Sequence, residues 1–295
     1  QLSYEGTLDS KGKLTSNRVE SVLYGSMEGA LHLVKADNTV NGGKEQMVFV
    51  PFEILSQTAG AAKALKPLEQ ASVGSIVPTH GVDGAWVSDT AYKTDRSGLK
   101  IRATRMNVYG GLRMGGNSYY GLDLCNAPSA GAICDSPAAS TDGIITPKLL
   151  FRIGSDVAAY SRMGQSWSKP LLANVRYNGV IKRVMFVGGG YDKCYESGTF
   201  KLGASGQPDS TCNGKSIAQG NAVYMVDALT GARLWWASNT GANTTNASMT
   251  HSIVSRVSTL DRNADGLVDH IYFGDLGGNV FRADFDNANQ RTAGN

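Results

Sequence analysis

A short pattern recurs four times in this chain of 295 residues, and it constrains the fold more than any other feature of the sequence. Each copy is an apolar stretch that stops at a glycine, then a turn, then a second stretch that stops at an aspartate. The glycines are Gly25, Gly110, Gly188 and Gly274, and the aspartates are Asp37, Asp123, Asp227 and Asp284. The glycines lie 85, 78 and 86 residues apart. Self-similarity near a fixed period indicates a repeat architecture.

Within each copy, apolar and polar residues alternate and glycines mark the turns, which is typical of an antiparallel β-meander. Meanders of three or four short strands arranged around a centre form a β-propeller. The period exceeds the roughly 40–50 residues of a plain blade, and we place the surplus in the loops 124–148 and 190–220. We therefore predict an all-β fold, a β-propeller that is incomplete or irregular and has long loops between its strands. A β-sandwich is the alternative, but it does not explain four matching units.

The predicted domain organisation is a polar N-terminal segment, 1–19, followed by a propeller domain, 20–295. The repeat units span approximately residues 20–57, 73–154, 166–238 and 250–285. Thr58–Ala71, rich in Ala, Leu and Lys, is the one plausible helix and falls in a connection. The chain opens without Met, and its fourth unit stops soon after Asp284 with no clear closing strand. We expect a fragment of a larger protein; the alternative is that residues 1–20 supply the missing strand edges.

A loop rich in oxygen ligands separates two predicted strands, 252–260 and 270–273. Acidic or amide side chains stand at alternate positions, and one backbone carbonyl completes the predicted ligands: Asp261, Asn263, Asp265, Leu267 and Asp269. These groups supply about the 6–8 oxygens that Ca²⁺ prefers, counting bidentate binding or water. Gly266 permits the sharp bend of such a loop. We predict Ca²⁺ as the cofactor of this hairpin.

The loop differs from other cation sites and from the sister units. Its twelfth position is Tyr272 instead of Glu, and strands flank it, so it is not an EF-hand. Mg²⁺ fits less well because it favours a stiffer octahedral shell with several waters. An acidic turn without metal is the alternative. The third unit closes the equivalent hairpin with the short turn 176–179, so the loop is an insertion that blade geometry does not require.

The four cysteines fall in two loops rich in small and polar residues. Cys125 and Cys134 lie nine residues apart, and Cys194 and Cys212 lie eighteen apart. The closely spaced pairs of common zinc sites are absent from the sequence. We predict two local disulfides, Cys125–Cys134 and Cys194–Cys212, with free cytosolic thiols as the alternative. Oxidised pairs would place the protein outside the cytosol.

Other features give little support to catalysis, membranes or nucleic acid. The net charge of +3 favours neither nucleic acid nor membrane as a partner. No apolar run approaches the roughly 20 residues of a membrane span. The four histidines show no triad spacing, and the glycine-rich stretch 113–117 joins two strands instead of opening a helix, as a phosphate loop would. Residues 227–235 resemble one tryptophan-docking repeat of quinoprotein propellers, which we interpret as blade packing. We predict no enzymatic activity and no catalytic residues.

Several stretches of the chain resemble the β-propeller region of the PilC/PilY family of type IV pilus tip-associated adhesins. The most specific is the loop DRNADGLVD at 261–269 followed by HIYFGDLGGNVFRADF at 270–285. Further support comes from residues 22–37, 48–55, 108–124, 166–175 and 222–236. The resemblance extends over about residues 20–285, nearly the whole chain.

The resemblance implies an exported, calcium-binding protein at the pilus tip, the cell surface or the outer membrane of a Gram-negative bacterium. It implies roles in pilus biogenesis, in extension against retraction, in twitching motility and in adhesion, with DNA uptake in relatives that act with competence pili. Calcium at the loop 261–269 is implicated in controlling retraction in the family. The implied partners are pilin or minor pilins and a host or abiotic surface ligand. The family's variable N-terminal adhesive module is not in this sequence, so the receptor cannot be read from it.

Two other functions remain open from the sequence. A quinoprotein-like dehydrogenase would need a quinone site and repeated docking motifs, of which the chain has one full copy. A structural scaffold stapled by calcium would need the loop only for stability. Nucleic-acid binding at a competence pilus is possible but has no support from the charge.

Overall fold

The computed structural model describes residues 1–36, 40, 42–56, 80–95, 97–135, 143–207 and 209–287. The chain divides into two compact units. The first comprises residues 1–109 and 121–150, and the second comprises residues 110–120 and 151–295. Within the described residues, no helix is long and apolar enough to cross a membrane.

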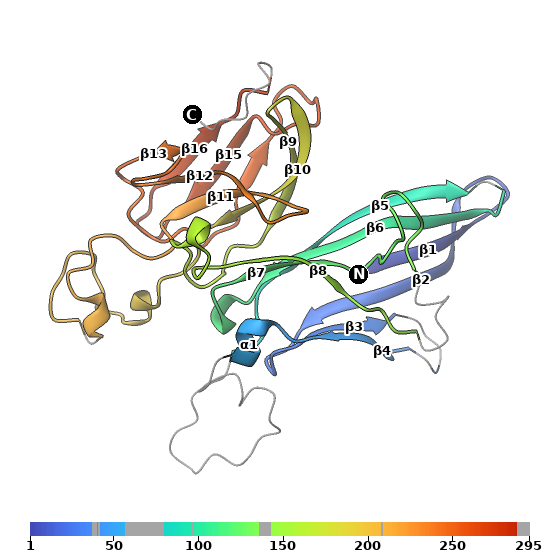
Figure 1. Ribbon diagram of the computed structural model, residues 1–295, viewed down its shortest axis with the longest axis horizontal. Coiled ribbons are helices and arrows are strands. Elements are labelled where there is room, and N and C mark those ends of the chain that lie inside the picture. Colours follow the sequence, from blue (N-terminus) through green and yellow to red (C-terminus); the bar gives the residue numbers. More distant parts are fainter. Residues whose placement is uncertain are drawn as a thin grey trace, which may run out of the picture. The chain divides into compact units, whose positions relative to one another are not determined.

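A curled antiparallel sheet builds most of the first unit (Figure 1). Its order is β4-β3-β2-β1-β6-β7-β8, and β5 pairs with β6. The strands are β1 (Leu2–Leu8), β2 (Leu14–Gly25), β3 (Leu31–Lys35), β4 (Glu45–Phe49), β5 (Trp86–Asp95), β6 (Lys100–Gly111), β7 (Tyr119–Asp123) and β8 (Lys148–Ile153). One face of this sheet is apolar and buried, because residues alternate between the two faces of a strand. The buried side chains include Leu2, Tyr4, Leu31, Leu33 and Met47.

The start of the chain is more ordered than the sequence suggested. The structure places β1 and part of β2 in the segment 1–19, to which we had assigned no individual strand. The segment has few apolar residues, but Leu2 and Tyr4 are buried and alternate with half-buried neighbours. A short α-helix, α1 (Phe52–Ser56), follows β4 and buries Ile54. The helix predicted over Thr58–Ala71 lies outside the described residues.

Two meanders build most of the second unit, and their strands pair antiparallel except for β13, which pairs parallel with β12. The first has the order β13-β12-β11-β10-β9, and the second has the order β14-β15-β16. Their strands are β9 (Leu171–Tyr177), β10 (Val180–Gly188), β11 (Ala222–Asp227), β12 (Arg233–Ser238), β13 (Thr244–Thr245), β14 (Ser258–Leu260), β15 (His270–Gly274) and β16 (Val280–Asp284). Short 3₁₀ helices form at Arg113–Gly115, Ala158–Tyr160, Lys193–Glu196 and Ser210–Cys212. Of the two strands predicted on either side of the loop 261–269, the structure confirms 270–273 within β15 and only the last three residues of 252–260, as β14.

The two meanders of the second unit share one apolar core. Trp235 of β12 meets Phe285 edge-on, with the ring centroids 5.3 Å apart, and Phe186 of β10 lies 5.7 Å from the same ring. The buried cluster consists of Ala173, Val175, Val184, Phe186, Val223, Met225, Trp235, Ala237, Met249, Ile253, Val257, Val268, Ile271, Phe273, Ala283 and Phe285. Two meanders packed face to face in this way are consistent with neighbouring blades of a β-propeller.

The predicted strand 252–260 is shorter in the structure, where only β14 is extended and paired. The residues before it use their hydrogen-bonding groups elsewhere. The Ile253 N–H donates to the Gly220 carbonyl at 3.0 Å, and the Leu276 N–H donates to the Ser252 carbonyl at 2.9 Å. These bonds tie the segment to two loops, so its backbone groups cannot join a ladder between neighbouring strands.

In two of the four repeat copies, a close backbone contact explains why the first strand ends at a glycine. A Cβ atom at Gly25 would overlap the Val82 carbonyl oxygen, and one at Gly188 would overlap the carbonyl oxygen of Ile253. At each of these strand ends another backbone segment crosses closely enough to exclude any side chain. Gly274 is different, because its Cβ would meet nothing nearer than the Asn279 carbonyl oxygen at 3.5 Å.

Both predicted disulfides are confirmed. Cys125 bonds to Cys134 in the first unit, with 4.5 Å between the Cα atoms, and Cys194 bonds to Cys212 in the second, with 5.8 Å. Buried Asp192 holds the base of the second loop, because its carboxylate accepts hydrogen bonds from the Cys194 N–H at 3.0 Å and the Gln219 N–H at 2.7 Å. Lys215 Nζ lies 2.6 Å from the same carboxylate.

Candidate metal centre

The loop 261–269 joins β14 to β15 and is anchored at its second half. Leu267 and Val268 are buried, whereas residues 262–266 are exposed. The Val268 N–H donates to the Asn174 carbonyl at 3.0 Å, and the Val268 carbonyl accepts a bond of 2.6 Å from Asn287 Nδ2. The loop therefore presents its polar half to solvent from a fixed base in the core of the second unit.

Hydrogen bonds between acidic side chains and backbone N–H groups shape the exposed half. Asp261 Oδ2 accepts from the Gly266 N–H at 2.8 Å, and Asp261 Oδ1 accepts from the Asp265 N–H at 3.2 Å. Asp265 Oδ1 accepts from the Leu267 N–H at 2.8 Å. Gly266 has φ 85°, and Ala264 has φ 60°, a region that residues with a Cβ atom seldom adopt. These two left-handed residues let the backbone curl around the Asp261 carboxylate.

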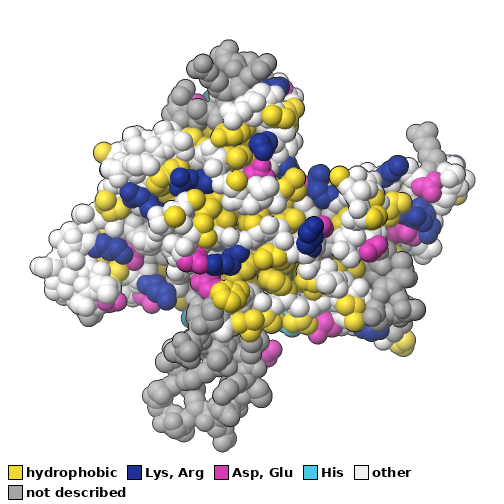
Figure 2. Space-filling model, viewed as in Figure 1, with side chains coloured by type: hydrophobic (Ala, Val, Ile, Leu, Met, Phe, Trp, Pro, Cys, Tyr) yellow, Lys and Arg dark blue, Asp and Glu magenta, His cyan; other side chains and the backbone are white. Residues whose placement is uncertain are grey.

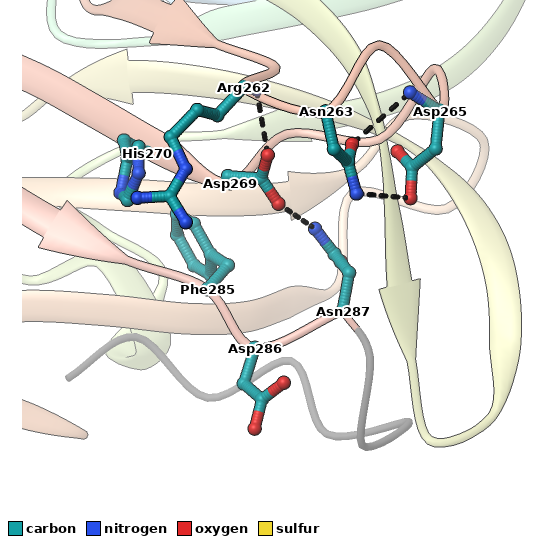
Figure 3. A pocket seen from close by; sticks show the side chains of 8 residues that line it. All are labelled: Arg262, Asn263, Asp265, Asp269, His270, Phe285, Asp286 and Asn287. Carbon is teal, nitrogen blue, oxygen red and sulfur yellow. Dashed lines mark hydrogen bonds between the residues drawn. The ribbon is translucent and has the colours of Figure 1, made fainter.

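The predicted ligands are only partly gathered. Figure 3 shows Asn263 beside Asp265, with Asn263 Nδ2 donating to Asp265 Oδ2 at 3.3 Å. Asp269 points elsewhere and accepts from the Arg262 N–H at 2.7 Å and from Asn287 Nδ2 at 3.5 Å. Within the described ranges, no group of three or more His, Cys, Asp or Glu side chains is arranged to hold a metal ion.

The residue types nevertheless fit a hard cation. Every side-chain donor at the predicted positions is a carboxylate or amide oxygen, which is the ligand type Ca²⁺ selects. Each carboxylate has about four lone-pair sites, so the bonds from the backbone leave Asp261 and Asp265 able to accept more. Asp269 would have to turn from Arg262 toward the other ligands. Calcium binding at this loop stays a prediction.

A cavity of about 280 Å³ opens beside the loop (Figure 3). It is lined by Arg262, Asn263, Asp265, Asp269, His270, Phe285, Asp286 and Asn287. His270 closes one side through a bond of 2.6 Å between its Nδ1 and Asp284 Oδ1. Sequence reasoning missed Asn287, which is buried and also accepts from the Arg176 N–H at 3.2 Å. Its setting in the polar stretch 286–295 gave no signal of that role.

The tryptophan-docking motif closes a hairpin and packs the core. Asp227 Oδ1 accepts from the N–H groups of Leu229 at 3.0 Å and Thr230 at 3.2 Å, and Asp227 Oδ2 accepts from Lys182 Nζ at 2.8 Å. Trp235 is 2% exposed and donates from Nε1 to Thr244 Oγ1 at 3.1 Å. Each conspicuous residue of the motif therefore has a structural partner within the second unit.

Replacing Lys182 with methionine should make the free energy of unfolding less dependent on pH in the acidic range. Burial raises the pKa of Asp227, but hydrogen bonds from Lys182 and the Leu229 N–H outweigh it and hold the pKa below the usual value of the carboxyl group. A depressed native pKa adds stability that is present above the unfolded pKa of about 3.9 and is lost as pH falls through the native pKa.

We expect Lys182→Met to lower the free energy of unfolding by about 1 kcal/mol at pH 7. The difference from wild type should shrink as pH falls through the depressed native pKa of Asp227, below which the carboxyl group is protonated in both proteins. Urea denaturation between pH 7 and pH 2 measures it. A difference that stays constant over that range would mean that Lys182 contributes through packing and not through the Asp227 charge.

Two meanders that share one apolar core are consistent with a domain of the β-propeller class. Residues 4–294 match the family model described as the PilY1 beta-propeller domain. The chain therefore belongs to the PilY1 β-propeller domain family, which confirms the resemblance seen in the sequence. The family is associated with type IV pili and is not a known family of enzymes.

A solved structure has a similar fold. The crystal structure of the Pseudomonas aeruginosa PilY1 C-terminal domain is 24% identical with a TM-score of 0.55, and the match covers 92% of this chain and 42% of that chain. BamB from Moraxella catarrhalis is 12% identical with a TM-score of 0.37, covering 97% of this chain and 50% of that one. This chain thus spans less than half the length of the PilY1 structure. The search of curated proteins gave no match.

Proposed function

We propose that this domain belongs to an exported type IV pilus-associated protein and that its loop 261–269 binds Ca²⁺. The protein would act without catalysis, in pilus biogenesis, in the balance of extension and retraction, and in surface adhesion. Family membership over nearly the whole chain supports the association with pili. The two disulfides accord with export. We place the protein at the pilus tip or the cell surface, with pilins or minor pilins as partners.

The observation that carries the calcium proposal is the contrast between two equivalent hairpins. β9 and β10 close with Asn178 and Gly179, whose φ angles of 50° and 82° suit a two-residue turn. A two-residue turn would also be sufficient to join β14 and β15. These strands are instead joined by nine residues rich in carboxylate oxygens. An acidic insertion that the blade does not require is best explained by a ligand for those oxygens.

Cation binding would change the loop in two ways. It would offset the charge of Asp261, Asp265 and Asp269, which otherwise repel one another. It would also fix the exposed residues 262–266 on the buried base formed by Leu267 and Val268. A loop that is ordered only with calcium could present or withdraw a contact surface for a pilus subunit.

A structural staple is the second candidate, and the burial of Leu267 and Val268 favours it. In that case calcium would stabilise the β14–β15 hairpin and leave pilus function unaffected. A quinoprotein-like dehydrogenase has less support, because the single docking motif is engaged in the Asp227 turn and the core. Nucleic acid also lacks support: Figure 2 shows basic side chains interspersed with acidic and apolar ones over the visible face.

Complementation of a deletion strain tests the proposed function. We expect Asp269→Ala to reduce piliation and twitching well below the wild-type level. Asp275→Ala is the matched control, because Asp275 is, like Asp269, a half-buried aspartate, and it lies at the other end of β15, where its carboxylate also accepts backbone N–H bonds. Immunoblotting would verify equal protein levels. Normal piliation and twitching with Asp269→Ala at an equal protein level would reject the regulatory role and favour the structural staple.

A further inference from the structure

The first unit carries a cavity that the proposed calcium loop does not use. Strands β2, β1 and β6 are neighbours in its sheet, and β5 pairs with β6 (Figure 1). A cavity of about 370 Å³ opens over these four strands and is lined by their residues and by Gln1. This volume falls within the roughly 300–1,000 Å³ of small-molecule sites. We call this cavity the polar groove.

Strand β5 brings an aromatic ring and two hydroxyl groups to the polar groove. Ser88, Thr90 and Tyr92 line it together, because alternate residues of a strand share one face. Tyr92 is 44% exposed, and its hydroxyl donates to the Ser3 carbonyl at 3.1 Å, which fixes the ring. Within the part of the chain that the structure describes, the Ser88 and Thr90 hydroxyls have no hydrogen-bond partner. Both can donate to and accept from a ligand.

Two carboxylates line the same groove, and each is held by basic side chains. Glu5 lies 2.6 Å from Lys100 Nζ and 3.0 Å from Arg102 Nε, and Glu20 lies 3.5 Å from an Arg18 guanidinium nitrogen. Their charges are therefore offset, but each carboxylate has about four lone-pair sites and can still accept from a ligand hydroxyl. This arrangement suits a neutral ligand that donates hydrogen bonds.

The floor of the polar groove is apolar, and its backbone is already paired. A Cβ atom at Gly6 would lie 2.6 Å from Leu14 Cδ1 and 3.2 Å from Ile101 Cγ2, so the glycine makes room for both side chains. Strand β1 pairs with β2 and β6, and β6 also pairs with β5. The backbone groups beneath the groove therefore belong to sheet ladders and are not available to an added peptide strand.

We propose that the polar groove binds a neutral saccharide. A sugar ring carries hydroxyl groups around its rim and C–H bonds on its faces, so it needs polar partners beside an apolar or aromatic surface. The Tyr92 ring would take the C–H face, and Ser88, Thr90 and the two carboxylates would bond to the hydroxyl groups. The inference rests on the surface adhesion proposed above, for which it names the class of ligand.

Saturation-transfer NMR with lactose, cellobiose, maltose and chitobiose tests the proposal on the longer natural polypeptide that contains this sequence. The wild type should bind at least one of the four. Tyr92→Ala should weaken that binding at least tenfold, because the aromatic surface is lost. Thr90→Val keeps the shape of the side chain and removes one hydroxyl, so we expect a loss of about fivefold. No binding of any of the four sugars by the wild type would overturn the proposal.

Tyr24→Ala is the matched control, because Tyr24 is a tyrosine of similar exposure, 45%, on β2 and does not line the groove. Circular dichroism would verify that all variants are folded. Equal weakening by Tyr24→Ala and Tyr92→Ala would reject the groove as the site. Binding of sialyllactose alone would reject a neutral ligand. Binding by the fragment 1–295 but not by the longer polypeptide would show that the groove is covered in the natural protein, which also rejects the proposal.

Piliation separates this inference from the proposed pilus role. Tyr92→Ala should restore piliation and twitching in the deletion strain to the wild-type level, while attachment to a surface coated with the bound sugar falls. A wild type that restores piliation but binds none of the sugars would overturn the ligand and leave the pilus role intact. Attachment to the coated surface that is unchanged in Tyr92→Ala would contradict the assignment of Tyr92 to the site.

Discussion

Gly188→Ala is expected to lower the free energy of unfolding by about 3 kcal/mol. The added Cβ would overlap the Ile253 carbonyl oxygen and lie 2.8 Å from Ile253 Cγ2. That carbonyl also accepts the Gly190 N–H at 3.0 Å, so moving it away would break a backbone hydrogen bond. Neither partner is the free end of a flexible side chain, so the crossing segment would have to shift as a whole.

Gly274→Ala is the matched control for this effect. Gly274 ends the corresponding strand of the next meander, but its Cβ would meet only the Asn279 carbonyl oxygen at 3.5 Å, an ordinary contact. We expect a change within about 1 kcal/mol, because alanine mainly reduces the freedom of the unfolded chain. Urea denaturation of the two variants compares them directly. Equal destabilisation by both would show that the glycines are required for the strand end itself and not for the crossing.

Trp235→Ala is expected to cost about 3–5 kcal/mol, the usual range for removing a large buried aromatic side chain. The ring is 2% exposed, meets Phe285 edge-on and lies among side chains from both meanders. The substitution leaves a cavity where the two sheets meet, and the Thr244 hydroxyl loses its donor.

Leu229→Ala controls for changes to the same hairpin. Leu229 lies in the turn before β12 and is 56% exposed, so we expect an effect within about 0.5 kcal/mol. Thermal unfolding followed by circular dichroism measures both variants. A loss below about 1 kcal/mol for Trp235→Ala would contradict the interpretation of the Asp227–Trp235 motif as blade packing.

The strands that sequence reasoning located best have neighbours close in the chain. β11, β12, β15 and β16 are apolar stretches joined by turns with their own signals, such as Asp227 and Gly231, so local pattern was sufficient. The two disulfides were predictable for the same reason, since each closes one loop. β1 was missed because its segment has few apolar residues, although one of its partners, β2, is close in the chain; its other partner, β6, lies about 95 positions away, as in the Glu5–Lys100 ion pair.

The surroundings of the candidate site depended on contacts that local pattern does not reveal. The shortening of the predicted strand 252–260 follows from bonds to Gly220 and Leu276, which lie in other loops. Asn287 supports the loop from beyond β16, and Asp269 pairs with the Arg262 N–H instead of facing the other predicted ligands. Residue types and spacing could indicate the chemistry of the loop, whereas the orientation of each carboxylate depends on which backbone N–H lies nearest in space.

Calcium titration by isothermal calorimetry tests the central claim most directly. The account predicts one binding site in the wild type and in the control Asp275→Ala, and at least tenfold weaker binding in Asp265→Ala, because a ligand and a negative charge are lost together. Circular dichroism would verify that the three proteins are folded. Identical calcium binding by the wild type and Asp265→Ala, or no binding by any of them, would contradict the assignment of the loop 261–269 as a calcium site.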